Sequence, residues 1–332
     1  MNNFQDYSNI SALIVGLGSV GTRHLNNLKS IGVKNLGVYR SQNNHTVQNA
    51  DLDNVNIYYD YKEALDHGYS SVFICNPTSM HMEYALEAAY SKCNLYIEKP
   101  LSNNLNHTEE LKHLQRANNL VVALGYQFKF HPNLKAIKEW LGNNAIGQIV
   151  HCAADVGEYL PSWHPWENYR DSYAAKAELG GGVALTLIHE IDYLEWLLGD
   201  LTLVSSHGGT STVLKTDVED FITATLMTPN NTPLNLHIDY LQNPACRKLK
   251  IIGEKGIIEW NYYTGTANLT ISGNIVETSL VAKSWERNTM FIETLNNFLQ
   301  CTQTMEEPMS NLNNSSHGLE ITLKIKDSIT LS

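Results

Sequence analysis

A glycine-rich turn near the start of the chain has the spacing of a phosphate-binding loop. Gly16, Gly18 and Gly21 form a G-x-G-x-x-G pattern that follows a short apolar run and precedes a segment of helical character. In that context Gly16 permits the tight turn, Gly18 lets a pyrophosphate approach the backbone, and Gly21 allows close packing of helix on strand. Ser19 and Val20 open the helix, whose N-terminus favours an anion. The pattern predicts a dinucleotide site; a glycine-rich turn without a ligand is the alternative.

The end of the next predicted strand bears on which dinucleotide is bound. Arg40 and Ser41 stand there, at the distance from the glycine loop where an NAD site usually carries Asp or Glu to bind the ribose 2′-hydroxyl. An Arg beside a Ser suits a 2′-phosphate, because the guanidinium supplies charge and forked donors. We therefore expect NADP to be favoured over NAD. The alternative is a surface Arg40 that leaves NAD accepted as well.

Three further segments follow the glycine loop in a fixed order. They are Cys75-Asn76-Pro77-Thr78-Ser79-Met80-His81, Glu98-Lys99-Pro100 after a predicted strand, and Gly180-Gly181-Gly182 followed by His189-Glu190-Ile191-Asp192. Together the four segments resemble the Gfo/Idh/MocA family (glucose-fructose oxidoreductase, inositol dehydrogenase and relatives) over essentially the whole chain. The resemblance implies a Rossmann domain followed by an α/β domain with a large, mostly antiparallel open sheet. It also implies hydride transfer between a nicotinamide and a ring carbon of a sugar or cyclitol.

The resemblance also implies roles for individual residues. It puts Lys99 beside the reacting hydroxyl and places His189 on a helix of the second domain. Many relatives carry an Asp four residues before that His, where this chain has Leu185; Asp192 lies on the same helical face as His189 and could orient it instead. The remaining residues expected at the cofactor are Cys75, Asn76, Pro77, Thr78, His81, Glu98 and Gln127.

Lys99 can serve as acid/base only if its ammonium form is disfavoured. An unperturbed lysine has a pKa of about 10.4. Burial and an adjacent oxidised nicotinamide would both lower that value. We therefore expect Lys99 to move the proton and His189 to support it. The alternatives are a surface lysine and an ordinary hydrogen-bonded histidine on a packed helix.

Residues 158–170 form an unusually aromatic stretch, and aromatic faces stack on sugar rings. We expect a substrate lid; a loop packed into its own small core is the alternative. The stretch is similar to loops of relatives in bacterial surface-sugar biosynthesis, and nucleotide-linked or acidic sugars would suit Lys129 and Arg170. The residues expected at the substrate are Lys99, Lys129, Tyr159, Trp163, His164, Trp166, Arg170, His189 and Asp192.

The elements that would position these residues fall into two sets. The first third predicts alternating strands and helices, and hence a doubly wound parallel sheet. Its strands are expected at 10–15, 36–39, 55–58, 71–75, 95–97 and 120–124, with helices at 20–30, 80–91 and 107–118. We expect a NAD(P)-binding Rossmann domain over residues 1–126.

After residue 126 the apolar runs are typical of antiparallel strands separated by turns. The expected strands are 149–156, 201–206, 221–227, 234–240, 248–252 and 257–262, and the expected helices are 132–142, 183–198, 285–299 and 318–329. We expect residues 127–332 to form a domain that binds substrate and, through the outer face of its sheet, a second copy in a homodimer or homotetramer.

Composition excludes several classes of function. The 332 residues include 23 Lys and Arg against 34 Asp and Glu, a net charge of −11, which disfavours nucleic acid and membrane surfaces as partners. The five cysteines are scattered without a Cys-x-x-Cys pair, so neither a disulfide framework nor a metal site is expected. No signal peptide or transmembrane run is visible, and we expect a cytoplasmic protein.

Three functions remain open from the sequence. The favoured one is an NAD(P)-dependent sugar dehydrogenase or reductase acting on CH–OH groups. A second is a glycosidase on the same scaffold, in which a tightly held cofactor oxidises the ring transiently. A third is a non-enzymatic regulator that senses dinucleotide, against which an intact Lys99 argues. The absence of a Cys/His ligand cluster disfavours a zinc alcohol dehydrogenase.

Overall fold

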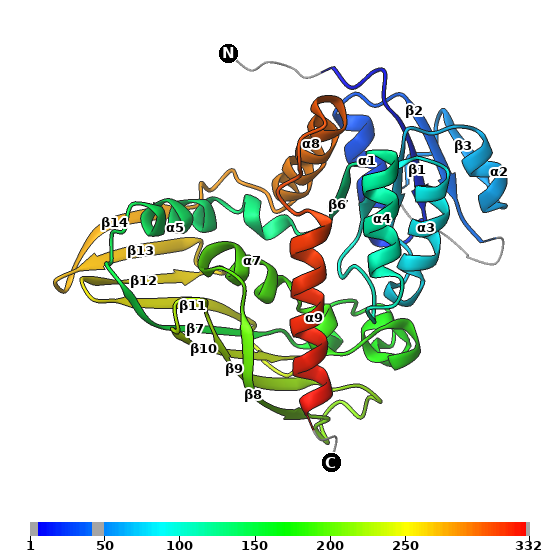
Figure 1. Cartoon of the computed structure of the whole chain (residues 1–332). Coiled ribbons are helices and arrows are strands. Elements are labelled where there is room, and N and C mark those ends of the chain that lie inside the picture. Colours follow the sequence, from blue (N-terminus) through cyan, green and yellow to red (C-terminus); the bar gives the residue numbers. More distant parts are fainter. Residues whose placement is uncertain (1–5, 42–49, 330–332) are drawn as a thin grey trace. The chain divides into compact units, whose positions relative to one another are not determined.

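A computed structural model describes residues 6–41 and 50–329 (Figure 1). The chain divides into two compact units: the first comprises Met1–Gln127 and Arg287–Ser316, the second Phe128–Glu286 and His317–Ser332. Each unit is therefore discontinuous, unlike the continuous domains 1–126 and 127–332 expected from sequence. Helix α8 (Asn288–Thr304) belongs to the first unit because its apolar face, including Leu295 and Phe298, joins the core of that unit.

The first unit is built on a six-stranded parallel sheet in the order β3-β2-β1-β4-β5-β6. The order reverses between β1 and β4, and such a reversal opens a crevice at the carboxyl ends of the strands. The strands are β1 (Ser11–Val15), β2 (Asn35–Tyr39), β3 (Val55–Tyr58), β4 (Ser71–Ile74), β5 (Asn94–Ile97) and β6 (Val122–Leu124). The helices are α1 (Ser19–Ser30), α2 (Tyr61–Asp66), the 3-10 turn η1 (Thr78–Met80), α3 (His81–Tyr90) and α4 (Thr108–Asn118).

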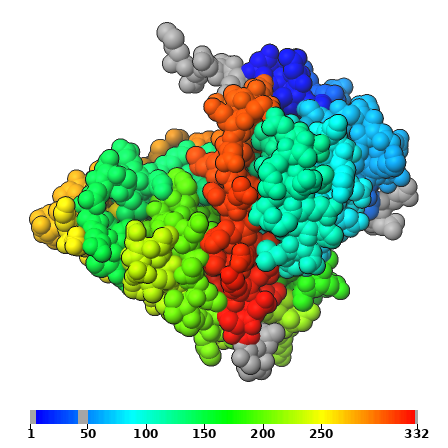
Figure 2. Space-filling view, viewed as in Figure 1, coloured from blue at the N-terminus to red at the C-terminus, as the bar shows by residue number. Residues whose placement is uncertain are grey.

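Apolar patterning explains why these helices pack as they do. One core cluster brings Leu25 of α1 and Phe298 of α8 against Ile14, Val38 and Phe73 of the sheet. Helix α4 buries Leu111 and Leu114 and turns its charged side chains to solvent. It accordingly lies on the surface of the first unit, in cyan-green in Figure 2.

The second unit is built on an eight-stranded sheet in the order β14-β13-β12-β11-β7-β10-β9-β8. Neighbouring strands pair antiparallel except β7 and β10, which are parallel. The strands are β7 (Ile149–Gly157), β8 (Thr202–Gly209), β9 (Phe221–Met227), β10 (Pro233–Asp239), β11 (Cys246–Gly253), β12 (Gly256–Asn261), β13 (Thr266–Ile271) and β14 (Asn274–Leu280). The α/β class with a mostly antiparallel second sheet, as expected from sequence, is confirmed.

The helices of the second unit pack on one face of that sheet. Helix α5 (Pro132–Gly142) contacts β13 and β14, and α6 (Val183–Thr186) contacts β9 and β10. Ser206 of β8 hydrogen-bonds the carbonyl of Ile325 in α9 (Leu312–Ser328), whose residues from His317 onward belong to this unit. Helix α7 (His189–Leu198) and the 3-10 turns complete the unit: η2 (Gln127–Phe130, which begins at the unit boundary), η3 (Leu160–Ser162), η4 (Tyr169–Asp171), η5 (Tyr173–Ala175) and η6 (Ala177–Leu179).

Two expectations about elements were wrong. The single helix expected over 183–198 is two helices, because Leu187 and Ile188 form a turn between α6 and α7. Strands β13 and β14 were not expected. Strand β14 is almost wholly exposed, so it lacks the buried apolar alternation by which a strand is identified.

Candidate functional site

The glycine loop has the close contacts that its spacing predicts. Gly16 has φ +89°, and a Cβ there would lie 3.0 Å from the backbone nitrogen of Asn76. A Cβ on Gly21 would lie 2.0 Å from the carbonyl oxygen of Gly16, so helix α1 sits directly on the turn. A Cβ on Gly18 would meet nothing within 4 Å. Gly18 caps α1 without a side-chain hydrogen bond, which leaves the first N–H groups of the helix open toward an anion.

Arg40 and Ser41 follow β2 at the same carboxyl edge of the sheet. The backbone N–H of Arg40 donates to the carbonyl of Tyr58 at 3.1 Å. This hydrogen bond fixes the position of the Arg40 backbone. Sequence reasoning missed a tyrosine cluster beside it: Tyr39 and Tyr84 contact through their hydroxyls at 3.4 Å, and both rings pack on Tyr61. The cluster joins β2, α2 and α3, which are far apart in sequence.

The turn after β4 places His81 differently from expectation. Its ring is buried, with Nδ1 2.8 Å from the carbonyl oxygen of Pro100 and Nε2 2.9 Å from that of Asn76. Burial lowers the pKa of His81, although both carbonyls oppose the effect. Both ring nitrogens of His81 therefore contact backbone carbonyls and are not directed at a ligand.

Three neighbours complete that turn. The side-chain amide of Asn76 is buried and makes no hydrogen bond to any described residue, so a bound molecule could use it. Burial raises the pKa of the Cys75 thiol, which keeps it protonated. Thr78 is buried at the start of η1, and Pro77 precedes it.

Glu98 faces the protein interior. Its Oε1 accepts a hydrogen bond from Nε2 of His24 at 2.6 Å, and both side chains are buried. Burial by itself would raise the pKa of Glu98, but the His24 hydrogen bond and nearby charges outweigh it, and the pKa lies below its usual range. Gly125 makes room for the carboxylate, since a Cβ there would lie 2.8 Å from Oε1.

Lys99 lies at the crevice where the motif residues meet. It directly follows β5, is half-buried, and precedes Pro100 through a cis peptide bond. Its backbone N–H donates to Oε2 of Glu98 at 3.3 Å. Because β1, β4 and β5 are parallel neighbours, the glycine loop, the Asn76 turn and Lys99 share one edge of the sheet.

In the second unit, His189 begins α7 and is buried. Its ring packs on Phe128 with centroids 5.1 Å apart. Asp192 has a partner that the sequence did not suggest: its Oδ1 pairs with Nζ of Lys129 at 2.8 Å, and its Oδ2 has no hydrogen-bond partner among the described residues. Burial raises the pKa of Asp192 despite Lys129. The contact between Lys129 and Asp192 joins η2, which carries the lysine, to α7, which carries the aspartate.

A buried arginine beside His189 was missed by sequence reasoning. Nε of Arg247 lies 2.9 Å from Oε1 of Glu190, Nη2 lies 3.4 Å from Oε1 of Glu158, and the guanidinium stacks over Phe128 at 4.5 Å. Burial raises the pKa of Glu190 to about 7, partly offset by Arg247. An isolated Arg on strand β11 carries no local signal that could have revealed the cluster.

The aromatic stretch 158–170 is anchored partly on its own unit. The Tyr169 hydroxyl and the Arg170 guanidinium both donate to the carbonyl of Leu214. Trp163 packs edge-on against Tyr240 at 5.5 Å. These contacts favour the self-packed alternative for part of the loop. Tyr159 is half-buried, whereas the ring of Trp166, 79% exposed, leans on His164 and remains open to solvent.

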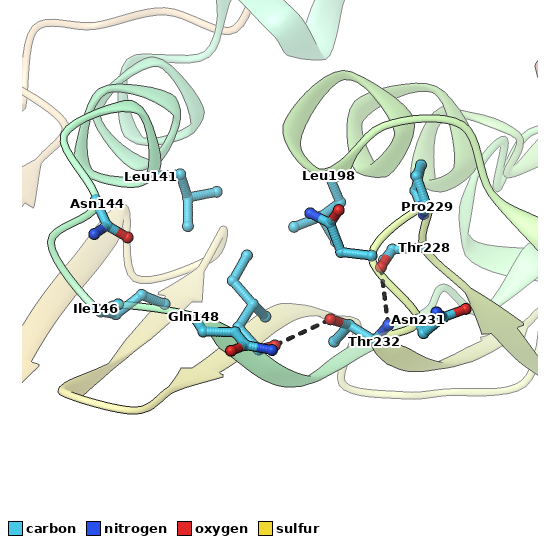
Figure 3. A pocket seen from close by; sticks show the side chains of 12 residues that line it. Leu141, Asn144, Ile146, Gln148, Leu198, Thr228, Pro229, Asn231 and Thr232 are labelled. Atoms are coloured by element: carbon cyan, nitrogen blue, oxygen red, sulfur yellow. Dashed lines mark hydrogen bonds between the residues drawn. The ribbon is translucent and has the colours of Figure 1, made fainter.

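One cavity of about 640 Å³ lies elsewhere in the second unit (Figure 3). It is bordered by the ends of α5 and α7 and by the turn between β9 and β10, and its polar lining consists of uncharged amides and threonines. None of the site residues expected from sequence lines it. Across residues 6–41 and 50–329, no cluster of His, Cys, Asp and Glu could hold a metal ion, and no helix is long and apolar enough to cross a bilayer.

Comparison with known proteins identifies the family. Residues 10–126 match the model of the oxidoreductase family with an NAD-binding Rossmann fold, and residues 134–259 match the GFO/IDH/MocA C-terminal domain. Together these matches span most of the chain. The chain belongs to the Gfo/Idh/MocA family.

Individual relatives are distant. The myo-inositol 2-dehydrogenase of Thermotoga maritima is 27% identical over 191 residues, 56% of this chain and 54% of that protein. The chain spans about half the length of the first curated relatives it matches. Levoglucosan dehydrogenase in complex with NADH has the same fold, with a TM-score of 0.86 at 16% identity over 96% of both chains. So does KijD10, a 3-ketoreductase from Actinomadura kijaniata in complex with NADP, with a TM-score of 0.82 at 17% identity over 96% of this chain and 98% of that one.

Proposed function

We propose that this protein is an NAD(P)-dependent oxidoreductase acting on a ring hydroxyl or ketone of a sugar or polyol, with Lys99 as acid/base. The observation that carries the proposal is the shared edge of the parallel sheet. There the glycine loop, closed by Gly16 and Gly21 and open above Gly18, lies two strands from Lys99. Family membership and the names of the relatives support the same class of reaction.

The residues present fit a dinucleotide. Its pyrophosphate would bind the open N-terminus of α1, and the unpartnered amide of Asn76 would face the nicotinamide half. When bound there, a nicotinamide would supply the hydride-transfer chemistry. Lys99 takes the hydroxyl proton in oxidation and returns it in reduction. His189 acts on the substrate as a hydrogen-bonding group, since Leu185 removes the carboxylate that would stabilise its charged form.

We propose NADP as the preferred cofactor because Arg40 stands where a 2′-phosphate would be bound. The comparisons leave the choice open, since the solved relatives include complexes with NADH and with NADP. The tyrosine cluster Tyr39, Tyr61 and Tyr84 supports the backbone from which Arg40 projects.

The contacts of Lys129 and Arg170 favour an uncharged substrate. Both cations were expected to suit acidic or nucleotide-linked sugars. Lys129 is instead neutralised by Asp192, and the Arg170 guanidinium is directed at a carbonyl of its own unit. A sugar or polyol without a phosphate or carboxylate therefore fits these residues better.

An assay with myo-inositol and with levoglucosan as probes tests the function. Formation of reduced nicotinamide with either probe, abolished in Lys99→Met, is the expected result. Cleavage of a glycoside without net change in nicotinamide would instead identify the cofactor-assisted glycosidase. Dinucleotide binding with neither activity across a wider panel of sugars would support the regulator.

A further inference from the structure

The two residues that flank Lys99 each contact a buried histidine. Glu98 contacts His24 of α1, and Pro100 contacts His81 at the start of α3. Helix α1 connects β1 to β2 and α3 connects β4 to β5, which run in opposite directions along the sheet order. Right-handed crossovers place two such helices on opposite faces of the sheet. The segment that carries Lys99 is therefore held from both faces.

The first contact links the segment that carries Lys99 to helix α1, which begins at the glycine loop. His24 is fully buried, and its Nε2 donates to Oε1 of Glu98 at 2.6 Å, while Oε2 accepts the N–H of Lys99 at 3.3 Å. The His24 ring packs edge-on against Tyr96 at 5.1 Å, and the absence of a side chain at Gly125 leaves space for the carboxylate. Because α1 begins at the glycine loop, the pair joins that helix to the lysine segment.

The second contact fixes the backbone on the C-terminal side of Lys99. His81 reaches the carbonyl of Pro100 with Nδ1 and that of Asn76 with Nε2. Carbonyl oxygens only accept, so a neutral ring donates one of these bonds and a protonated ring donates both. In either state the ring lies between the turn after β4 and the residue after Lys99.

We propose that His24 and His81 are positioning residues that fix the backbone on either side of Lys99, with Glu98 as the link between His24 and the lysine. We call the contacts of His24 with Glu98 and of His81 with Pro100 the clamp. The importance of Lys99 itself rests on the proposed function, whereas the clamp lies wholly within the first unit. A misplacement of a reacting group by about 1 Å can cost roughly a hundredfold in rate. Loosening either histidine should therefore lower turnover without removing the cofactor site.

The carboxylate of Glu98 also sets the charge beside Lys99. The titratable and charged groups that act on it or respond to it are Arg23, His24, Cys75, His81, Tyr96 and Lys99. A neighbouring negative charge favours the ammonium form of a lysine. Neutralising Glu98 by substitution should therefore lower the pKa of Lys99.

A titration of Lys99 tests the clamp without any substrate. The full-length protein is labelled with [ε-13C]lysine, and the Lys99 signal is assigned by its loss in Lys99→Arg. We expect Glu98→Gln to lower the pKa of Lys99 by about one unit. His24→Gln, which retains a donor near the position of Nε2, should stay close to wild type. Tyr96→Phe, a change in the same buried cluster, is the matched control and should not move the pKa.

Steady-state kinetics with myo-inositol or levoglucosan complete the test. His24→Leu and His81→Ala should lower kcat about 10- to 100-fold while the dinucleotide Kd changes less than about threefold. His81→Asn, which keeps a donor toward Pro100, should recover part of the loss. Folding of each variant is checked by its melting temperature.

The outcomes separate the two proposals. An unchanged Lys99 titration in Glu98→Gln would overturn the role of Glu98 beside the lysine, and an equal loss of kcat in Tyr96→Phe would overturn the clamp. If neither probe nor any sugar of the wider panel is turned over but the titration shifts as expected, the clamp stands and the proposed function fails. If Lys99→Met reduces turnover but the histidine variants do not, the function stands and the clamp is wrong.

Discussion

We propose that a single side chain, Arg40, sets the cofactor preference. A charge-assisted hydrogen bond contributes about 1.5–3 kcal/mol, or roughly 10- to 100-fold in affinity. We therefore expect wild-type protein to bind NADP more tightly than NAD, and Arg40→Asp to reverse the ratio of the two dissociation constants. Fluorescence titration with both reduced cofactors measures that ratio. Equal or tighter NADH binding by the wild type would show that Arg40 does not bind a 2′-phosphate.

Glu190 predicts a pH dependence of stability. Its pKa is raised from 4.5 to about 7 by burial, so the folded state holds the proton more tightly than the unfolded state. Its contribution to stability is greatest below the unfolded value and is lost as the pH rises through about 7. Glu190→Gln should therefore show a flatter fall in melting temperature between about pH 5 and pH 8.

The control for Glu190→Gln is Glu259→Gln, an exposed site that should reproduce the wild-type slope. Glu195, whose pKa burial also raises to about 7, should leave part of the slope in the variant. A variant slope identical to wild type would contradict the assignment to Glu190.

Individual residues were easier to predict than their partners. The motif spacing indicated Lys99 at the carboxyl end of a strand, and the structure places it there. The partners of Glu98 and Asp192 were not predicted, because His24 and Lys129 lie far away in the sequence. Arg247 had no signal at all, because one arginine in a strand gives no local indication that it is buried between two glutamates.

At the scale of elements, Gly18 and Gly21 form a matched pair for testing the glycine loop. Gly21→Ala would drive a Cβ into the carbonyl of Gly16, so we expect a loss of several °C in melting temperature as well as weaker dinucleotide binding. Gly18→Ala meets open space and φ −75° suits alanine, so the fold should keep its stability. Its methyl group would still obstruct a pyrophosphate, and the dinucleotide Kd should rise at least about tenfold. Unchanged binding in Gly18→Ala would contradict the placement of the pyrophosphate.

The elements that could be predicted are those with a clear apolar pattern, either periodic or continuous. Buried parallel strands are continuous apolar runs, and the expected positions agree with β1 to β6 within a few residues. Strand β14 failed because it is an exposed edge strand. The position of helix α8 in the sequence was predicted, but its membership of the first unit was not. That membership depends on which core its apolar face joins, and periodicity alone does not contain that information.

At the scale of the whole molecule, a homodimer or homotetramer through the eight-stranded sheet remains a prediction. Ala153 is on β7 near the centre of that sheet, paired with Asn235 and Lys250 on the neighbouring strands. Sedimentation analysis should show an oligomer, and Ala153→Arg should convert it to monomer with an unchanged melting temperature. A wild-type monomer, or an oligomer that tolerates Ala153→Arg, would rule out this contact face.

We propose that Lys99 moves the proton. The most direct measurement compares kcat and dinucleotide Kd in wild type, Lys99→Met and His189→Asn, with kcat/KM followed against pH. The account predicts a loss in kcat of about 10²–10⁴-fold in Lys99→Met with an unchanged Kd, and a smaller loss in His189→Asn that acts partly through KM. Near wild-type turnover in Lys99→Met, with His189→Asn inactive, would contradict the account and assign the proton transfer to the histidine.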